Sequence, residues 1–204
     1  MPRILLLLML LVSFVTHANT VLILGDSLSA GYRMNAEQAW PPLLEKQWQQ
    51  EGRKVEVINA SVSGDTTQGG LQRLPSLLTK HKPSLMLLEL GANDGLRGLP
   101  PASIEQNLEK MIGLAQQAGT KVVLTQIQLP PNYGRRYLQQ FEGIYPKVAK
   151  THELALLPFF VAPLVEQNGM MMDDGLHPTA DAQPKIVQQV HAFLTPHLKD
   201  SHKL

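Results

Sequence analysis

The chain changes from apolar to polar within the stretch Thr20-Val21-Leu22-Ile23-Leu24-Gly25-Asp26-Ser27. The run Thr20–Leu24 is typical of a strand buried on both faces, and the Gly-Asp-Ser that follows predicts a turn. Similar apolar runs recur at Val55–Ile58, Leu85–Leu90, Lys121–Ile127 and Leu154–Phe159. The sequence therefore predicts five strands, the first of which ends just before a serine.

Helical periodicity fills the segments between these runs. Apolar residues recur at helical spacing in Ala36–Gln50, Gln68–His81, Ile104–Ala118, Arg136–Thr151 and Ala182–His197, and a short helical turn is expected over Leu28–Gly31. Apolar strands that alternate with helices are typical of a parallel sheet covered on both faces. We therefore expect one α/β domain, a three-layer α/β/α sandwich, over residues 19–204.

Residues 1–18 have the layout of a secretory signal peptide. Met1-Pro2-Arg3 gives a basic start, Ile4–Val15 is apolar, and Thr16-His17-Ala18 predicts cleavage after its last residue. The alternative is a membrane anchor, but Ile4–Val15 as a helix would span about 18 Å, against a hydrocarbon core of roughly 30 Å. We expect a periplasmic protein without a stable membrane anchor.

The composition excludes several classes of protein. The chain has 18 Lys and Arg against 17 Asp and Glu, so it lacks the positive charge that favours nucleic-acid binding. It has no cysteine, which excludes disulfides, a thiol nucleophile and iron–sulfur clusters. His152-Glu153 lacks a second histidine at the spacing of a helical zinc pair. We expect no metal and no cofactor.

Four short motifs follow one another in the order Gly25-Asp26-Ser27-Leu28, Gly64, Gly91-Ala92-Asn93-Asp94 and Asp174-Gly175-Leu176-His177. Three of them lie just beyond a predicted strand, and the last lies in the loop before the final helix. The carboxyl ends of parallel strands share one edge of the sheet, where ligands bind, so we expect the motifs to meet there. Together they supply a hydroxyl nucleophile, oxyanion donors and an Asp–His pair, which are the groups that acyl transfer needs.

Ser27 is the candidate nucleophile. It opens a helical turn, where a backbone N–H is unsatisfied and the local dipole favours negative charge, so its own N–H can stabilise an oxyanion. The structural alternative is an ordinary helix-capping serine; the other motifs favour catalysis. We expect Asp26 to point elsewhere and to fix the loop by accepting backbone N–H hydrogen bonds.

His177 is the candidate base. Pro178 follows it and restricts its backbone to extended conformations. An Asp-x-x-His turn lets Asp174 accept the Nδ1 hydrogen of His177, which leaves Nε2 to take the proton of Ser27. Asp173 is the second candidate for the orienting acid, and either aspartate could instead cap the turn.

Gly64 and Asn93 are the candidate partners of Ser27 in an oxyanion hole. A glycine lets a backbone N–H approach a substrate without a Cβ in the way, and an asparagine amide adds a donor. Gly64 could instead be a turn residue, and Asn93 a helix cap. The chain has neither the Gly-x-Ser-x-Gly elbow of α/β-hydrolases nor a glycine-rich phosphate loop with a lysine.

The four motifs resemble those of the SGNH (GDSL) hydrolase family, and the chain departs from them at no motif position. Three further stretches, Leu22–Met34, Leu129–Tyr137 and Asp181–Pro184, resemble exported members that cleave long-chain acyl thioesters, lysophospholipids and simple esters. The resemblance covers essentially the whole chain after the leader. It implies a flavodoxin-like sheet of five parallel strands and no cofactor.

The resemblance also implies roles for individual residues. Ser27 would be the nucleophile, His177 the base and Asp174 the orienting acid. The N–H groups of Ser27 and Gly64 and the side chain of Asn93 would be the oxyanion donors. The expected substrate contacts line an acyl groove and are Leu129, Pro130, Pro131 and Tyr133.

We therefore expect a monomeric serine esterase or thioesterase that acts on a small acyl ester or thioester through an acyl-enzyme. One alternative is a carbohydrate O-deacetylase on the same fold, and another is a periplasmic lipid-binding protein whose motifs are inactive. Leu96, Leu99 and the Leu129-Pro130-Pro131 segment offer apolar surface near the predicted edge, which favours an acyl chain, but packing explains them equally well.

Overall fold

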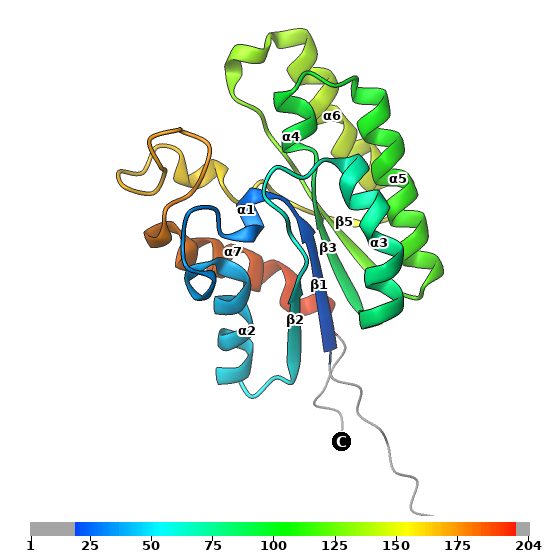
Figure 1. Cartoon of the computed structure of the whole chain (residues 1–204), viewed down its shortest axis with the longest axis vertical. Coiled ribbons are helices and arrows are strands. Elements are labelled where there is room, and N and C mark those ends of the chain that lie inside the picture. Colours follow the sequence, from blue (N-terminus) through cyan, green and yellow to red (C-terminus); the bar gives the residue numbers. More distant parts are fainter. Residues whose placement is uncertain (1–18, 199–204) are drawn as a thin grey trace, which may run out of the picture.

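A sheet of five parallel strands forms the centre of the computed structural model, which describes residues 19–198 (Figure 1). The predicted signal peptide lies outside the described residues. The strands are β1 (Asn19–Gly25), β2 (Val55–Asn59), β3 (Leu85–Glu89), β4 (Lys121–Thr125) and β5 (Ala155–Leu157). Their order across the sheet, β2-β1-β3-β4-β5, is that of a flavodoxin-like fold, so the predicted fold class is confirmed.

Helices cover both faces of the sheet (Figure 1). One face packs against α2 (Trp40–Gln50) and α7 (Gln183–Leu194), and the other packs against α3 (Thr67–His81), α5 (Pro101–Gln117) and α6 (Arg135–Thr151). Strand β1 serves both cores, because successive side chains of a strand point to opposite faces. Val21 and Ile23 belong to one apolar cluster and Leu22 and Leu24 to the other, which explains the unbroken apolar run.

Prolines account for two of the differences between the predicted and observed boundaries. Helix α2 begins at Trp40 rather than Ala36, because Pro41 and Pro42 suit a first helical turn but not a helix interior. Residues Ala36–Gln38 form a separate 3₁₀ turn instead. Strand β5 ends at Leu157, directly before Pro158, whose nitrogen has no hydrogen to donate.

The strand order reverses at β1, because β2 lies on one side of it and β3 on the other. Strand β1 lies between β2 and β3, and its carboxyl end leads into the short helix α1 (Ser27–Ala30). The carboxyl end of β3 leads into the short helix α4 (Ala92–Leu96). Ligands bind at such a switch point in open α/β sheets.

Among residues 19–198, no helix is both long enough and apolar enough to cross a membrane.

Candidate active site

Hydrogen bonds connect Ser27, His177 and Asp174 in a line. The Nε2 atom of His177 lies 2.8 Å from Ser27 Oγ, and its Nδ1 atom lies 2.8 Å from Asp174 Oδ2. Because a carboxylate only accepts hydrogen bonds, Nδ1 carries a hydrogen and Nε2 presents its lone pair to the serine hydroxyl. This arrangement allows the imidazole to take the proton of Ser27.

The loop that carries His177 is closed by the backbone. Met171 and Pro178 form an antiparallel bridge, and the Met172 N–H donates to the His177 carbonyl at 2.8 Å. Within the loop, Asp174 Oδ1 accepts the backbone N–H groups of Leu176 and His177 at 2.9 and 3.0 Å. The same carboxylate therefore folds the loop and orients the histidine ring.

The Asp174 carboxylate stays ionised in this loop. Partial burial raises its pKa, but the hydrogen bonds from His177 and Leu176 outweigh that effect and hold the pKa at about 2. Asp173, the second candidate, is exposed, and its side chain makes no hydrogen bond or ion pair with any residue from 19 to 198. The geometry thus distinguishes the two neighbouring aspartates.

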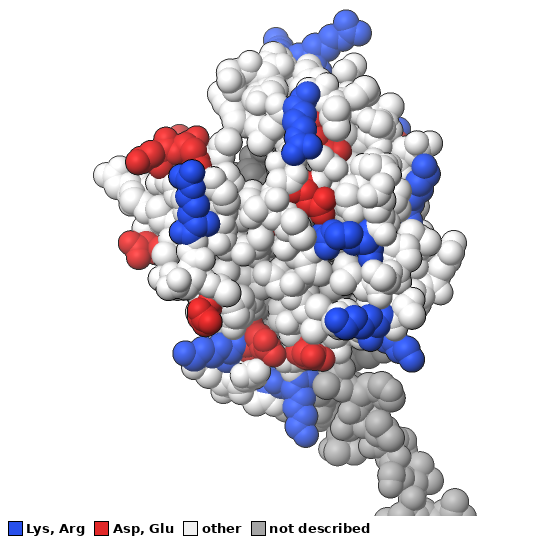
Figure 2. Space-filling view, in the orientation of Figure 1, with Lys and Arg blue, Asp and Glu red and all other residues white. Residues whose placement is uncertain are grey.

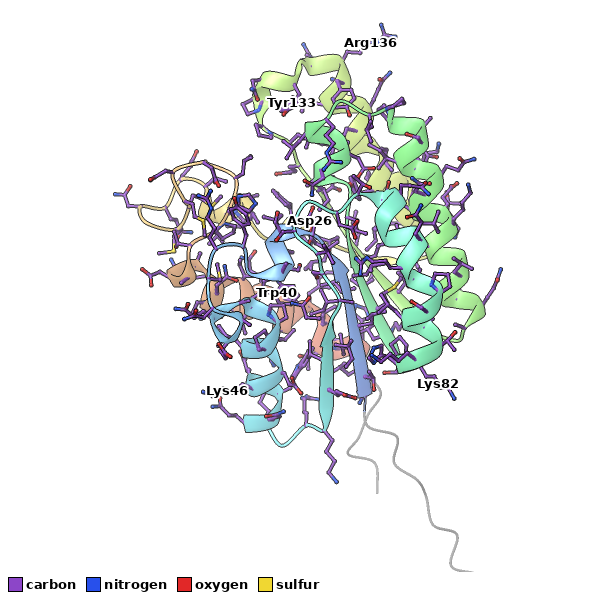
Figure 3. All side chains as sticks on the ribbon, in the orientation of Figure 1. Asp26, Trp40, Lys46, Lys82, Tyr133 and Arg136 are labelled. Carbon is purple, nitrogen blue, oxygen red and sulfur yellow. The ribbon has the colours of Figure 1, made fainter. Side chains whose placement is uncertain are left out.

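Asp26 fixes the turn at Ser27 and also holds Asn93. Its Oδ1 atom accepts the Leu28 N–H at 3.1 Å, as the cap of α1, and its Oδ2 atom accepts Asn93 Nδ2 at 3.1 Å. An asparagine amide has two N–H groups, so one stays available after this contact. Figure 3 places Asp26 at the end of β1, near the centre of the view. The side chain of Asn93 is therefore held beside the serine.

Gly64 lies in the loop between β2 and α3, with a left-handed backbone (φ +81°). A Cβ at this position would meet nothing within 4 Å, so the backbone conformation is what requires the glycine. The carbonyl of Gly64 accepts a hydrogen bond from Arg97 at 3.1 Å. This contact links the loop to the end of α4, which carries Asn93.

An apolar cavity of about 510 Å³ opens beside Ser27 and His177. One wall comes from Leu96, Leu129, Pro130 and Pro131, and the opposite wall from Phe159, Val161, Ala162, Pro163, Val165 and Met171. Figure 2 shows the surface hollowed between these two projecting segments, with charged side chains on both sides of the opening. The volume lies within the range of small-molecule sites.

Three of the four predicted substrate contacts line this cavity: Leu129, Pro130 and Pro131. Tyr133 is not among the lining residues, and its hydroxyl donates to the carbonyl of Leu96 at 3.1 Å. It lies in the segment that projects near Arg136 in Figure 3. Tyr133 thus supports the wall instead of forming its surface.

Comparisons with known proteins agree with this geometry. A sequence model described as the GDSL-like Lipase/Acylhydrolase family matches residues 23–183. The chain belongs to this family. The matched segment contains all four motifs, strands β2 to β5 and the last three residues of β1.

Relatives of known activity cover most of the chain. An arylesterase of Vibrio mimicus is 53% identical over 178 residues, which are 87% of this chain and 89% of the relative. The thioesterase 1/protease 1/lysophospholipase L1 of Escherichia coli K12 is 51% identical over 191 residues, 94% of this chain and 90% of the relative. The solved structure of a psychrotrophic esterase, EstA of Pseudoalteromonas, inhibited by monoethylphosphonate, has a TM-score of 0.85 and 38% identity, covering 88% of this chain and 98% of that one.

Tyr32 belongs to this GDSL-family site, although none of the four motifs predicts a role for it. Its ring stacks on that of His177, with centroids 4.1 Å apart and planes inclined by 28°. The Arg33 guanidinium lies 5.1 Å from the centroid of the same tyrosine ring. The stacking holds the imidazole from one side, while Asp174 holds it at its edge. The one feature of the sequence that could have indicated this role is the position of Tyr32, five residues after the nucleophile.

Asp94 and Thr67 form a second contact that the motifs do not predict. Asp94 is buried and accepts both the N–H and the hydroxyl of Thr67, at 2.9 and 2.6 Å. This pair joins the start of α3 to α4, and therefore fixes the loop of Gly64 relative to Asn93. The acidic residue that follows Asn93 in the motif is structural.

Proposed function

We propose that the chain hydrolyses carboxylic esters and thioesters through an acyl-enzyme on Ser27. The observation that carries this proposal is the line from Ser27 Oγ to His177 to Asp174, with both contacts at 2.8 Å. Family membership and relatives named arylesterase and thioesterase support it. A lipid-binding protein without activity has no need for a histidine oriented in this way.

In the proposed reaction, Ser27 Oγ attacks the carbonyl carbon as His177 Nε2 takes its proton. The resulting oxyanion is stabilised by the N–H groups of Ser27 and Gly64 and by the free N–H of Asn93. The bond to the leaving alcohol or thiol then breaks, and that group receives the proton from His177. Water, activated by the same histidine, releases the carboxylic acid and restores the serine. Asp174 stabilises the imidazolium that forms at each stage.

Covalent labelling tests the proposal directly. A fluorophosphonate should form one adduct, on the peptide that contains Ser27, with loss of esterase activity in proportion to labelling. The relative EstA, whose solved structure is inhibited by monoethylphosphonate, provides a precedent for such a reagent. Full activity in a fully labelled protein, or an adduct on another residue, would contradict the proposal.

Replacing Asn93 by alanine should lower kcat by about 10²–10³-fold, because one donor to the oxyanion is lost. KM should change much less, since the charge develops only in the transition state. Steady-state kinetics on a p-nitrophenyl ester would measure both. Asn168 is exposed and does not line the cavity, so Asn168→Ala is the matched control. An unchanged kcat in Asn93→Ala would remove this residue from the oxyanion hole.

The two apolar walls favour an acyl chain over a sugar. The value of kcat/KM should rise with acyl length from acetyl onwards, by at most about fourfold for each methylene, given about 0.8 kcal/mol per buried CH₂. An acyl series to palmitoyl, run with matched esters, thioesters and lysophospholipids, would measure this. A sharp fall after the shortest chains would instead support the carbohydrate O-deacetylase.

We also propose that residues 1–18 direct export to the periplasm and are removed after Ala18, and that the enzyme acts as a monomer. The intact mass of protein from a periplasmic extract should begin at Asn19. An unprocessed chain confined to the cytoplasm would contradict export. Light scattering of the purified protein would test the monomer.

A further inference from the structure

Two carboxyl groups that the proposed reaction does not use are buried beneath Ser27. Asp26 and Glu89 are both 0% exposed. Asp26 follows β1 and Glu89 ends β3, and the register of these strands places Gly25 opposite Glu89. No ion pair among residues 19–198 includes either carboxyl group. Burying acids without a cation is costly, so a reason for their presence is needed.

Glu89 makes direct contacts to the turn that carries the nucleophile. Its Oε2 atom accepts the Asp26 N–H at 3.3 Å and the Ser29 hydroxyl at 2.7 Å. These two residues lie on either side of Ser27 and its neighbour Leu28. The carboxyl group therefore holds the turn from below at two points.

The Gly25 of the first motif is shaped to this carboxyl group. A Cβ at Gly25 would lie 2.5 Å from Glu89 Oε2, and 3.0 Å from the hydroxyls of both Ser29 and Ser61. No side chain fits in that space. The glycine of the motif is thus explained by Glu89, which packs directly against the backbone before the nucleophile.

The surroundings favour a neutral Glu89 beside Asp26. Burial raises the pKa of Glu89 well above its usual value, and the charge of Asp26 raises it further. Burial also raises the pKa of Asp26, to about 7, against the opposing hydrogen bonds from Leu28 and Asn93.

The other charged groups near the pair do not neutralise it. Asp65 and Asp94 both raise the pKa of Asp26. Arg73 forms an ion pair with Asp65, and the charge of Arg97 lowers the pKa of Asp94. Tyr145 stays neutral, because burial raises its pKa well above the usual value. A protonated, neutral Glu89 is consistent with all of these neighbours.

We propose that Glu89 is a positioning residue for the oxyanion hole, which holds Asp26 so that Asp26 in turn holds the Asn93 amide towards the substrate. The chain of contacts runs from Ser29 Oγ to Glu89, from Glu89 to Asp26, and from Asp26 Oδ2 to Asn93 Nδ2. The chain ends at Asn93, whose free N–H is the proposed oxyanion donor. The inference rests on the proposed function, because it assumes that Asn93 stabilises the oxyanion.

Two replacements of Glu89 separate its hydrogen bonds from its volume. Glu89→Gln keeps an oxygen that accepts from the Ser29 hydroxyl and the Asp26 N–H. Glu89→Met is of similar size and makes none of these bonds. We expect Glu89→Gln to keep kcat within about threefold, and Glu89→Met to lose about tenfold or more in kcat with little change in KM. Glu56, exposed on β2, provides the control Glu56→Met.

A double-mutant cycle distinguishes positioning from a merely structural role. If Glu89 acts through Asn93, Glu89→Met should lower kcat in the wild-type background but not in Asn93→Ala. If Glu89→Met does not fold, Asp26→Ala replaces it in the same cycle, since alanine has no side-chain acceptor for Asn93. Additive losses, an unchanged kcat, or a Glu89→Gln variant as impaired as Glu89→Met would overturn the proposal.

Failure of the Glu89 proposal can be distinguished from failure of the proposed function. Every variant in the cycle keeps Ser27, so fluorophosphonate labelling of the wild type tests the nucleophile by itself. A wild type that is neither labelled nor active refutes the acyl-enzyme. A labelled, active wild type with additive losses refutes the role of Glu89 alone.

Discussion

Replacing Ser27 by alanine should lower the hydrolysis of a p-nitrophenyl ester by about 10⁶-fold in kcat, as in serine proteases that lose their nucleophile. Alanine removes the oxygen that forms the acyl-enzyme, and His177 then has no proton to accept. Any residual rate would come from binding and the oxyanion donors, which by themselves accelerate hydrolysis about 10³–10⁴-fold over water. The methyl group of alanine leaves α1 and its Asp26 cap in place, so the fold should not change.

Kinetics and labelling together check this result. The wild type should release a burst of p-nitrophenol and react with a fluorophosphonate, and Ser27→Ala should do neither. Ser76→Ala, on the exposed side of α3, is the matched control and should behave as wild type. A Ser27→Ala protein that keeps more than about a hundredth of the activity would show that another residue is the nucleophile, because this loss of nucleophile costs far more.

The sheet and its motifs could be predicted because their signals are local. Apolar runs such as Thr20–Leu24 mark strands buried on both faces, and polar turns mark where they end. Helix periodicity located the helices to within a few residues. The strand order is not local information, and it came only from the resemblance of the motifs to a known family.

Contacts between residues that are far apart in the sequence could not be predicted in the same way. Glu89 lies within an apolar run, and its meeting with Asp26 depends on the register of β1 against β3. The second wall of the cavity, at residues 161–165, is formed by a segment without any periodic pattern. Tyr32 meets His177 across most of the chain length. An acid inside a buried strand was nevertheless a visible signal, because such a group is rarely buried without a partner.

Replacing Asp174 by asparagine should lower kcat by about 10⁴-fold while the loop keeps its shape. The amide oxygen can still accept the N–H groups of Leu176 and His177, but the amide NH₂ then faces Nδ1 of the imidazole. This favours the tautomer with hydrogen on Nε2, which cannot accept the proton of Ser27. KM should change little, because Asp174 does not line the cavity.

The neighbouring aspartate provides a strict control for this prediction. Asp173→Asn removes the same charge one residue away, from a side chain that makes no hydrogen bond or ion pair within residues 19–198, and kcat should stay within about threefold of wild type. The pH dependence gives a second check. The hydrogen bonds of Asp174 lower its pKa from 3.8 to about 2. The stability that they give the folded protein is therefore complete above pH 3.8 and is lost only as the pH falls towards 2. Protonation of Asp174 should therefore not limit kcat between pH 5 and 9. Equal losses of kcat in Asp174→Asn and Asp173→Asn would mean that charge in this loop, not orientation of His177, sets the rate.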